Sequence, residues 1–155
     1  MTTPWEAGEA RTEDDAALAR RARPGPLLGI IGFCVAAAGL AGAAIWPQLW
    51  VFGFRPYGIF QYLMPPLLSL CGLFAVPMGA WTAMGRLWAA IGGALAMAGL
   101  LFFGGIWSIY VLVNGGFTPL YFLVVSGALV GLTASLAGCW LSFQVSQARR
   151  ALLED

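Results

Sequence analysis

Four long apolar segments, separated by short polar ones, dominate the sequence. They run over residues 27–47, 57–83, 87–113 and 119–146. A helix needs about 20 apolar residues to cross the hydrocarbon core of a bilayer. Each segment reaches that length, so the pattern predicts an all-α fold with four transmembrane helices in a domain spanning residues 27–148.

The segments between the predicted helices contain typical turn residues. Met84–Arg86 includes a glycine, and Asn114–Pro119 reads Asn-Gly-Gly-Phe-Thr-Pro. Glycine accepts a positive φ, and proline fixes φ and lacks a donor, so both favour turns. Three further prolines lie inside the second predicted helix and are expected to bend it: Pro65, Pro66 and Pro77.

The composition places these helices in a membrane. The chain of 155 residues is 60% hydrophobic and 10% charged, whereas a soluble domain carries roughly 25% charged residues. Between Pro24 and Ala148 the only charged side chains are Arg55 and Arg86. So little charge cannot cover a surface that faces water, which makes lipid the main solvent. The net charge of +1, with no basic stripe, argues against nucleic-acid binding.

Polar tails flank the apolar domain. In residues 1–26, Thr12 and Asp15 fit a capping box, which predicts a short helix over residues 12–23. This polar tail and the length of the first apolar segment differ from a secretory signal, whose apolar core has roughly 7–15 residues. We therefore expect the first helix to be retained and residues 149–155 to form a short second tail.

The arginines lie on one side of the predicted topology, with a single exception. Seven of the eight basic residues precede the first helix, occupy the turn at Arg86 or follow the fourth helix, and only Arg55 lies on the opposite side. Cytoplasmic loops carry an excess of arginine and lysine. Both termini are therefore expected in the cytoplasm, and we expect an integral protein of the bacterial cytoplasmic membrane.

The first and third apolar segments resemble each other in sequence. IGFCVAAAGL at Ile31–Leu40 and IGGALAMAGL at Ile91–Leu100 match at six of ten positions. Each is followed by an Ile-Trp pair and then by an aromatic residue, one further residue and a proline, which is Pro56 in one half and Pro119 in the other. These landmarks predict two tandem helical hairpins, related as a parallel 2+2 repeat about an axis along the membrane normal. The alternative is a chance likeness between small-residue helices.

The side chains that usually carry membrane chemistry are missing from the predicted helices. The chain has no histidine, and all seven acidic residues lie in the terminal tails. Intramembrane ionisable groups mark ion pathways and proton relays, and histidine is the commonest general base and metal ligand. The sequence has no phosphate-binding loop or nucleophile elbow either. We therefore expect no enzymatic activity, no cofactor and no metal site.

One charged residue lies among aromatic rings between the first two predicted helices. Arg55 has Trp50, Tyr57 and Gln61 close to it in sequence. A guanidinium pairs with phosphate or carboxylate and stacks on aromatic rings. This group is therefore a candidate contact for a lipid headgroup, a quinone-like ligand or a partner protein. The alternative is an ordinary turn with an interfacial aromatic belt.

Other aromatic residues gather near the ends of the predicted helices. Trp107 and Tyr110 lie toward the end opposite the termini, and Trp81, Trp88 and Trp140 toward the end that carries them. Such residues place an apolar ring and a polar edge in different media. Interfacial belts are therefore expected to account for most of these aromatic residues.

Small residues recur every four positions along the fourth predicted helix, at Gly127, Gly131, Ser135 and Cys139. They share one helix face, and small faces let helices approach closely in lipid. We expect this face to pack within the four-helix domain. The alternative is a contact with another subunit.

These features favour a small non-catalytic membrane protein that serves as an accessory or assembly subunit of a larger complex. Its expected surroundings are the lipid bilayer and either a larger membrane protein or further copies of itself. One alternative is a small membrane subunit of a multicomponent transporter. A second alternative, based on the residues around Arg55, is a lipid- or quinone-binding module.

Overall fold

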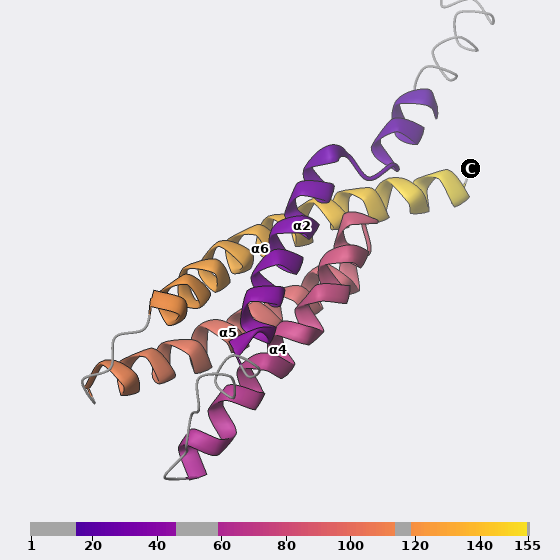
Figure 1. Ribbon diagram of the computed structural model, residues 1–155. Coiled ribbons are helices and arrows are strands. Elements are labelled where there is room, and N and C mark those ends of the chain that lie inside the picture. Colours follow the sequence, from indigo (N-terminus) through magenta and orange to yellow (C-terminus); the bar gives the residue numbers. More distant parts are fainter. Residues whose placement is uncertain (1–14, 46–58, 114–118, 155) are drawn as a thin grey trace, which may run out of the picture.

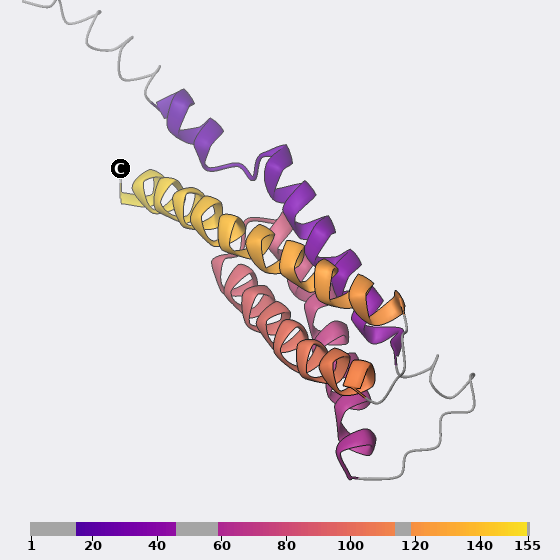
Figure 2. The same ribbon diagram turned by 90° about the vertical axis from the view of Figure 1, so that its left-hand side faces the viewer.

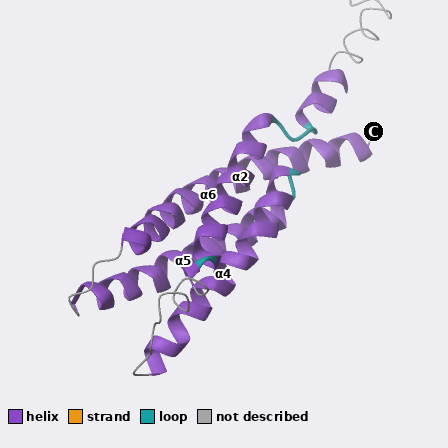
Figure 3. Ribbon diagram, in the orientation of Figure 1, coloured by secondary structure: helices purple, strands orange, loops and turns teal. Residues whose placement is uncertain are grey.

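Figure 1 shows the computed structural model of the chain, which describes residues 15–45, 59–113 and 119–154. Four long helices are present: α2 (Pro26–Ala43), α4 (Ile59–Ala83), α5 (Leu87–Val113) and α6 (Pro119–Glu154). In these ranges Figure 3 shows helices joined by short connections. Each long helix is long and apolar enough to cross a membrane. The predicted all-α fold with four membrane-spanning helices is confirmed.

The four helices form an antiparallel bundle in which each helix packs on two neighbours. α2 and α5 each contact both α4 and α6, whereas the diagonal pair α2 and α5 scarcely touch. Figures 1 and 2 show the helices alternating in direction along the chain. Short connections place consecutive helices side by side in such a bundle. The order around the bundle is therefore the order along the sequence.

Three segments gather at one end of the bundle: the N-terminal region, the turn between α4 and α5, and the last turns of α6 (Figures 1 and 2). The turn contains Gly85, whose φ of +74° suits a residue without a side chain. A Cβ on Gly85 would lie 3.4 Å from Val145 Cγ1 and 3.6 Å from Pro24 Cβ. The three segments therefore lie close together.

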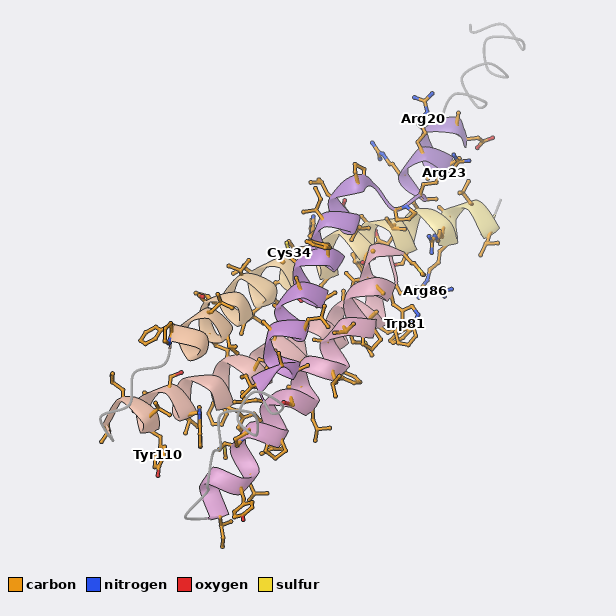
Figure 4. All side chains as sticks on the ribbon, viewed as in Figure 1. Arg20, Arg23, Cys34, Trp81, Arg86 and Tyr110 are labelled. Carbon is orange, nitrogen blue, oxygen red and sulfur yellow. The ribbon has the colours of Figure 1, made fainter. Side chains whose placement is uncertain are left out.

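We call this end of the bundle the arginine end. Figure 4 shows Arg20, Arg23 and Arg86 there. Arg149 lies there as well, since its Nε donates a hydrogen bond to the backbone oxygen of Ala22 at 3.1 Å. Arginines that the sequence analysis assigns to one face of the membrane are thus brought together.

The helix boundaries differ from the predicted segments at three places. Residues 15–21 form a short helix, and Thr12, the predicted cap, lies outside the described residues. α2 ends at Ala43, before the predicted end at residue 47. α6 continues well past the predicted end at residue 146, because the residues that follow include good helix formers.

The length of α6 carries its C-terminal turns out of the apolar layer. The helix has 36 residues, which at 1.5 Å per residue span about 54 Å. The hydrocarbon core of a bilayer is only about 30 Å thick. Since the charged residues of α6 lie in its last turns, these turns extend beyond the membrane core at the arginine end.

α4 stays helical through its three internal prolines, Pro65, Pro66 and Pro77. Ser69, one turn after Pro65, donates its hydroxyl to the backbone oxygen of Ala43 at 3.2 Å. The last carbonyls of a helix lack partners within that helix, so this bond satisfies one at the end of α2. The bend expected at the prolines stays a prediction.

α2 and α4 touch through their backbones at two places seven residues apart. Gly32 faces Gly79, and Gly39 faces Gly72. A Cβ on Gly39 would lie 2.7 Å from the carbonyl oxygen of Gly72 and 2.9 Å from the Cβ of Ala75. In lipid, such close approach strengthens the van der Waals attraction that holds helices together. The two helices therefore approach each other backbone to backbone at both places.

Trp107 lies in the core of the bundle, so it is one of the aromatic residues that the interfacial belts do not account for. Its exposed fraction is 1%, and its ring stacks on that of Tyr110 with centroids 5.6 Å apart. It shares the buried stripe of α5 with Met97, Leu100 and Gly104. The position of a residue along a helix sets its depth in the membrane, but the rotation of the helix decides whether it faces lipid or protein.

Trp81 and Trp88 have the surroundings expected of an interfacial belt. Their rings pair at the arginine end with centroids 5.0 Å apart, and Figure 4 shows Trp81 beside Arg86. Both side chains are exposed. An indole at this level contacts acyl chains with its ring and headgroups with its N–H.

Candidate functional site

The first predicted site lies mostly outside the described ranges. Trp50, Arg55 and Tyr57 belong to residues 46–58, which the structure leaves undescribed. Gln61 lies in the first turn of α4, and its side chain is not among those described. The contact with a lipid or partner expected around Arg55 therefore stays a prediction.

The small-residue face of α6 points into the bundle. Its members are Gly127, Gly131, Ser135 and Cys139. A Cβ on Gly131 would lie 3.1 Å from the Cγ of Met97 and 3.3 Å from the Cβ of Ala38. Ser135 is fully buried, and Cys139 is half-buried. This face meets α5 and α2, which is the geometry of the intramolecular alternative.

The interior of the bundle contains hydroxyl groups and no acidic or basic side chain from the described helices. Ser108, Ser135 and Ser142 have buried hydroxyls that make no hydrogen bond to any described residue. The hydroxyl of Thr82 donates to the backbone oxygen of Met78 at 2.7 Å. A hydroxyl without an adjacent base or a metal is a weak nucleophile, so these groups do not form a catalytic arrangement by themselves.

The outer surface of α6 has its hydroxyls satisfied locally. Ser126 donates to the backbone oxygen of Phe122 at 2.8 Å, and Thr133 donates to that of Val130 at 2.9 Å. Serine and threonine on a helix commonly bond back to the preceding turn in this way. Because each hydroxyl finds its acceptor within its own helix, this surface can face acyl chains without leaving a polar group unpaired.

A cleft of about 940 Å³ opens at the arginine end, between residues 18–28 and residues 141–151 of α6. Its polar lining comes from Arg21, Arg23, Gln144 and Gln147, and most of the remaining lining is apolar. Leucine and valine side chains form the part next to the start of α2. The cleft therefore joins a polar region and an apolar region at the level where the membrane-spanning helices begin.

One hydrogen bond joins the two walls of this cleft. The Nε of Arg149 donates to the backbone oxygen of Ala22 and so ties the last turns of α6 to the N-terminal segment. Pro24 lies near the turn at Gly85, since a Cβ built on Gly85 would be 3.6 Å from the Cβ of Pro24. The arginines in the lining are free of such a role: within the described residues, neither Arg21 nor Arg23 forms an ion pair.

Within the described ranges no group of three or more His, Cys, Asp or Glu side chains could hold a metal ion. The three cysteines, Cys34, Cys71 and Cys139, are separate thiols. Chemically, the arrangement at the arginine end offers guanidinium and amide donors to an anion, beside an apolar wall.

Comparison of the chain with protein-family models, with curated proteins and with solved structures gives no match.

The sequence analysis did not find the cleft. Arg21 and Arg23 are recognisable as part of a basic segment, and Gln144 and Gln147 as polar residues near the end of α6. What brings the two groups together is the length of α6 and the turn at Pro24-Gly25-Pro26, which aligns the N-terminal helix beside it. Neither feature has a local sequence signal that shows which residues will lie against it in the fold.

Proposed function

We propose that the chain is a small, non-catalytic membrane subunit that assembles with a larger membrane protein. The observation that carries this proposal is the interior of the bundle. Apart from the last turns of α6, none of the four long helices holds an acidic or basic residue, and enzymes and ion-coupled transporters of the membrane use such groups inside the bundle. The backbone contact of α2 with α4 at Gly39 and Gly72 also leaves no passage between these helices.

The outward face of α2 supports docking of a partner helix. Phe33 is 74% exposed, and Gly29 and Ala37, one turn to either side, are also exposed. Small residues that flank a large side chain allow another helix to approach closely and to accommodate the ring. α5 has an exposed alanine as well, Ala98, with the large residues Leu95 and Phe102 beside it.

Purification from native membranes tests this proposal. We expect the tagged chain, extracted in a mild detergent, to retain one larger membrane protein in a fixed ratio. Ala37→Leu should release that protein, because the added side chain occupies the position beside Phe33 where a partner helix would approach. Ala98→Leu adds the same group at an exposed position of α5 and should not. Recovery of the chain alone, before and after chemical cross-linking in the membrane, would contradict the proposal.

The same experiment decides a second candidate, a subunit of a multicomponent transporter. The two candidates differ in the identity of the partner rather than in the properties of this chain. A partner with ionisable groups inside its own membrane helices would support the transporter subunit. A partner without them would support an assembly role.

For orientation, we propose that the arginine end faces the cytoplasm of a bacterial cell. The shared position of Arg23, Arg86 and Arg149 supports this, since arginine is enriched on the cytoplasmic side. In a cysteine-free background, Arg86→Cys should resist an impermeant thiol reagent in intact cells, and Thr118→Cys should react. The reverse labelling would place the arginine end outside.

A further inference from the structure

We infer that the cleft between residues 18–28 and α6 binds one anionic phospholipid of the surrounding bilayer. The inference goes beyond the proposed function and is independent of it, because it concerns the arginine end and not the outward face of α2. The proposed occupant is a lipid. Displacement of that lipid by an acidic peptide, which could compete for the same charges, is one of the outcomes of the experiment.

The polar half of the cleft has the donors that a phosphodiester requires. Arg21 and Arg23 both line it, and neither is neutralised by an ion pair among the described residues. Arginine presents several N–H donors in a planar fork that matches phosphate oxygens. Gln144 and Gln147 add side-chain amides on the facing wall, which can donate to phosphate or to a headgroup hydroxyl.

The apolar half of the cleft fits the upper part of the acyl chains. Leu27 and Leu28 from the start of α2 and Leu141 and Val145 from α6 line it, and Leu27 is 62% exposed. These residues belong to helices that continue into the membrane. An acyl chain lying against them would therefore run on directly into the bilayer core, whereas an acidic peptide would leave these leucines uncovered.

The depth of the cleft matches the position of lipid phosphates. α2 begins at Pro26, immediately after the arginines, so Arg23 lies at the boundary between the apolar helix and water. Anionic headgroups at that level attract basic residues next to a membrane span. The volume of about 940 Å³ lies within the range of roughly 300–1,000 Å³ that is typical of ligand sites, enough for a headgroup and glycerol with the acyl chains extending outward.

The walls of the cleft are joined by a hydrogen bond that does not involve the lining arginines, which allows a clean test. The Nε of Arg149 donates to the backbone oxygen of Ala22. Neutralising Arg21 and Arg23 should therefore remove the anion donors without opening the cleft. Other exposed arginines at the same end, Arg20 and Arg150, do not line it and provide a control with the same loss of charge.

The experiment measures retention of phosphatidylglycerol by the purified full-length chain in a non-ionic detergent, using native mass spectrometry. We expect one bound phosphatidylglycerol and at least about tenfold weaker retention for Arg21→Gln/Arg23→Gln, since hydrogen bonds to charged groups are among the stronger ones. Arg20→Gln/Arg150→Gln should stay within about twofold of the parent. Ala151→Trp, which fills the cleft and keeps every charge, should lose the lipid as well.

Three results would overturn the inference. Equal losses in the two double variants would mean that the lipid is attracted by total charge and not by the cleft. Equal retention of phosphatidylcholine would remove the anionic preference. Displacement of phosphatidylglycerol by a synthetic peptide of residues 1–14, which carry four of the seven acids, would assign the cleft to the acidic tail. Unchanged circular dichroism of each variant confirms that the helices are intact, and the Ala151→Trp arm still decides the question if a double variant does not fold.

Discussion

The glycine contact between α2 and α4 can be tested with a single methyl group. Gly39→Ala adds a Cβ that would lie 2.7 Å from the carbonyl oxygen of Gly72. Carbon–oxygen contacts in proteins rarely fall below about 3.3 Å, so the two helices must separate by roughly 0.6 Å. Gly29→Ala, on the same helix, adds the same methyl group at a position with no atom within 4 Å. The two variants differ only in what the methyl group meets.

The magnitude follows from the packing lost across the interface. A gap of about 0.5–1 Å removes a quarter to a half of the attraction between the atoms on its two sides, and overpacked positions typically cost about 1–3 kcal/mol. Alanine favours a helix over glycine by about 1 kcal/mol, and this gain applies to both variants. This gain therefore cancels when the stabilities of the two variants are compared with each other. We therefore expect Gly39→Ala to unfold with a free energy about 1–3 kcal/mol lower than that of Gly29→Ala.

Reversible unfolding in mixed micelles, followed by circular dichroism as the denaturing detergent is increased, measures this difference. Gly72→Ala should reproduce the loss, because its Cβ would meet the backbone of Gly39 and Ala43. The double variant Gly39→Ala/Gly72→Ala should lose less than the two single losses combined, since the first methyl group already separates the helices. Equal stability of Gly39→Ala and Gly29→Ala would refute a backbone contact at this site.

Two further substitutions probe the other interfaces. Gly131→Leu should destabilise the bundle by several kcal/mol, because its side chain would enter the space of Met97. Leu136→Ala, at a position 58% exposed, should stay within about 1 kcal/mol of the parent. Similar stability of both variants in the same unfolding assay would show that the α6 face does not pack. Trp107→Ala should lower the free energy of unfolding by about 3–5 kcal/mol. Trp140→Ala, at a position 65% exposed, should lower it much less. The opposite ranking would mean that Trp107 lies at the membrane interface and not in the core.

The number and approximate extent of the membrane helices could be predicted from the sequence, because hydropathy over about 20 residues reports a property of the segment itself. The rotation of each helix could not. Trp107 illustrates this, since its place near a helix end suggested the interface and only the packing of α5 shows it in the core. Leu132 is a related case: it would suit a lipid-facing control by type, yet it packs on the buried cluster.

The glycine contact between α2 and α4 was also not predicted from the sequence, although the spacing of its glycines is visible there. α2 has Gly32 and Gly39 seven residues apart, and α4 has Gly72 and Gly79 with the same spacing. Seven residues make nearly two helical turns, so each pair lies on one face. Many other small residues in these helices have similar spacings, however. Which pairs meet depends on the antiparallel register of the two helices, and a local pattern does not contain it.

The burial of residues in the two halves can be compared at each residue shift that pairs the halves of the predicted repeat. Burial does not support the shift of 60 residues. Val35 is fully buried, whereas Leu95, its partner in the alignment of Ile31–Leu40 with Ile91–Leu100, is 69% exposed. A shift of 60 residues therefore pairs opposite faces of α2 and α5. At a shift of 61, which also aligns the two Ile-Trp pairs, Gly42 pairs with the half-buried Phe103 and the buried Ile45 with the exposed Ile106, but four other buried positions of α2 pair with buried positions of α5. The pairs are Leu28 with Ala89, Gly32 with Gly93, Val35 with Ala96 and Gly39 with Leu100.

The second helices of the two halves correspond at a different residue shift from the first helices. A shift of 63 residues aligns Pro56 with Pro119 and Arg86 with Arg149. It also pairs buried positions of α4 with buried positions of α6: Pro65 with Ala128, Leu68 with Gly131, Gly72 with Ser135, Ala75 with Gly138, Gly79 with Ser142 and Thr82 with Val145. The shift therefore differs by two residues between the first and second helices of the two halves. The observed connections differ in the other direction, since residues 44–58 join α2 to α4 and only residues 114–118 join α5 to α6. Buried stripes on packed helices also pair at some shift whether or not the two halves share an origin, so the duplicated hairpin stays a prediction.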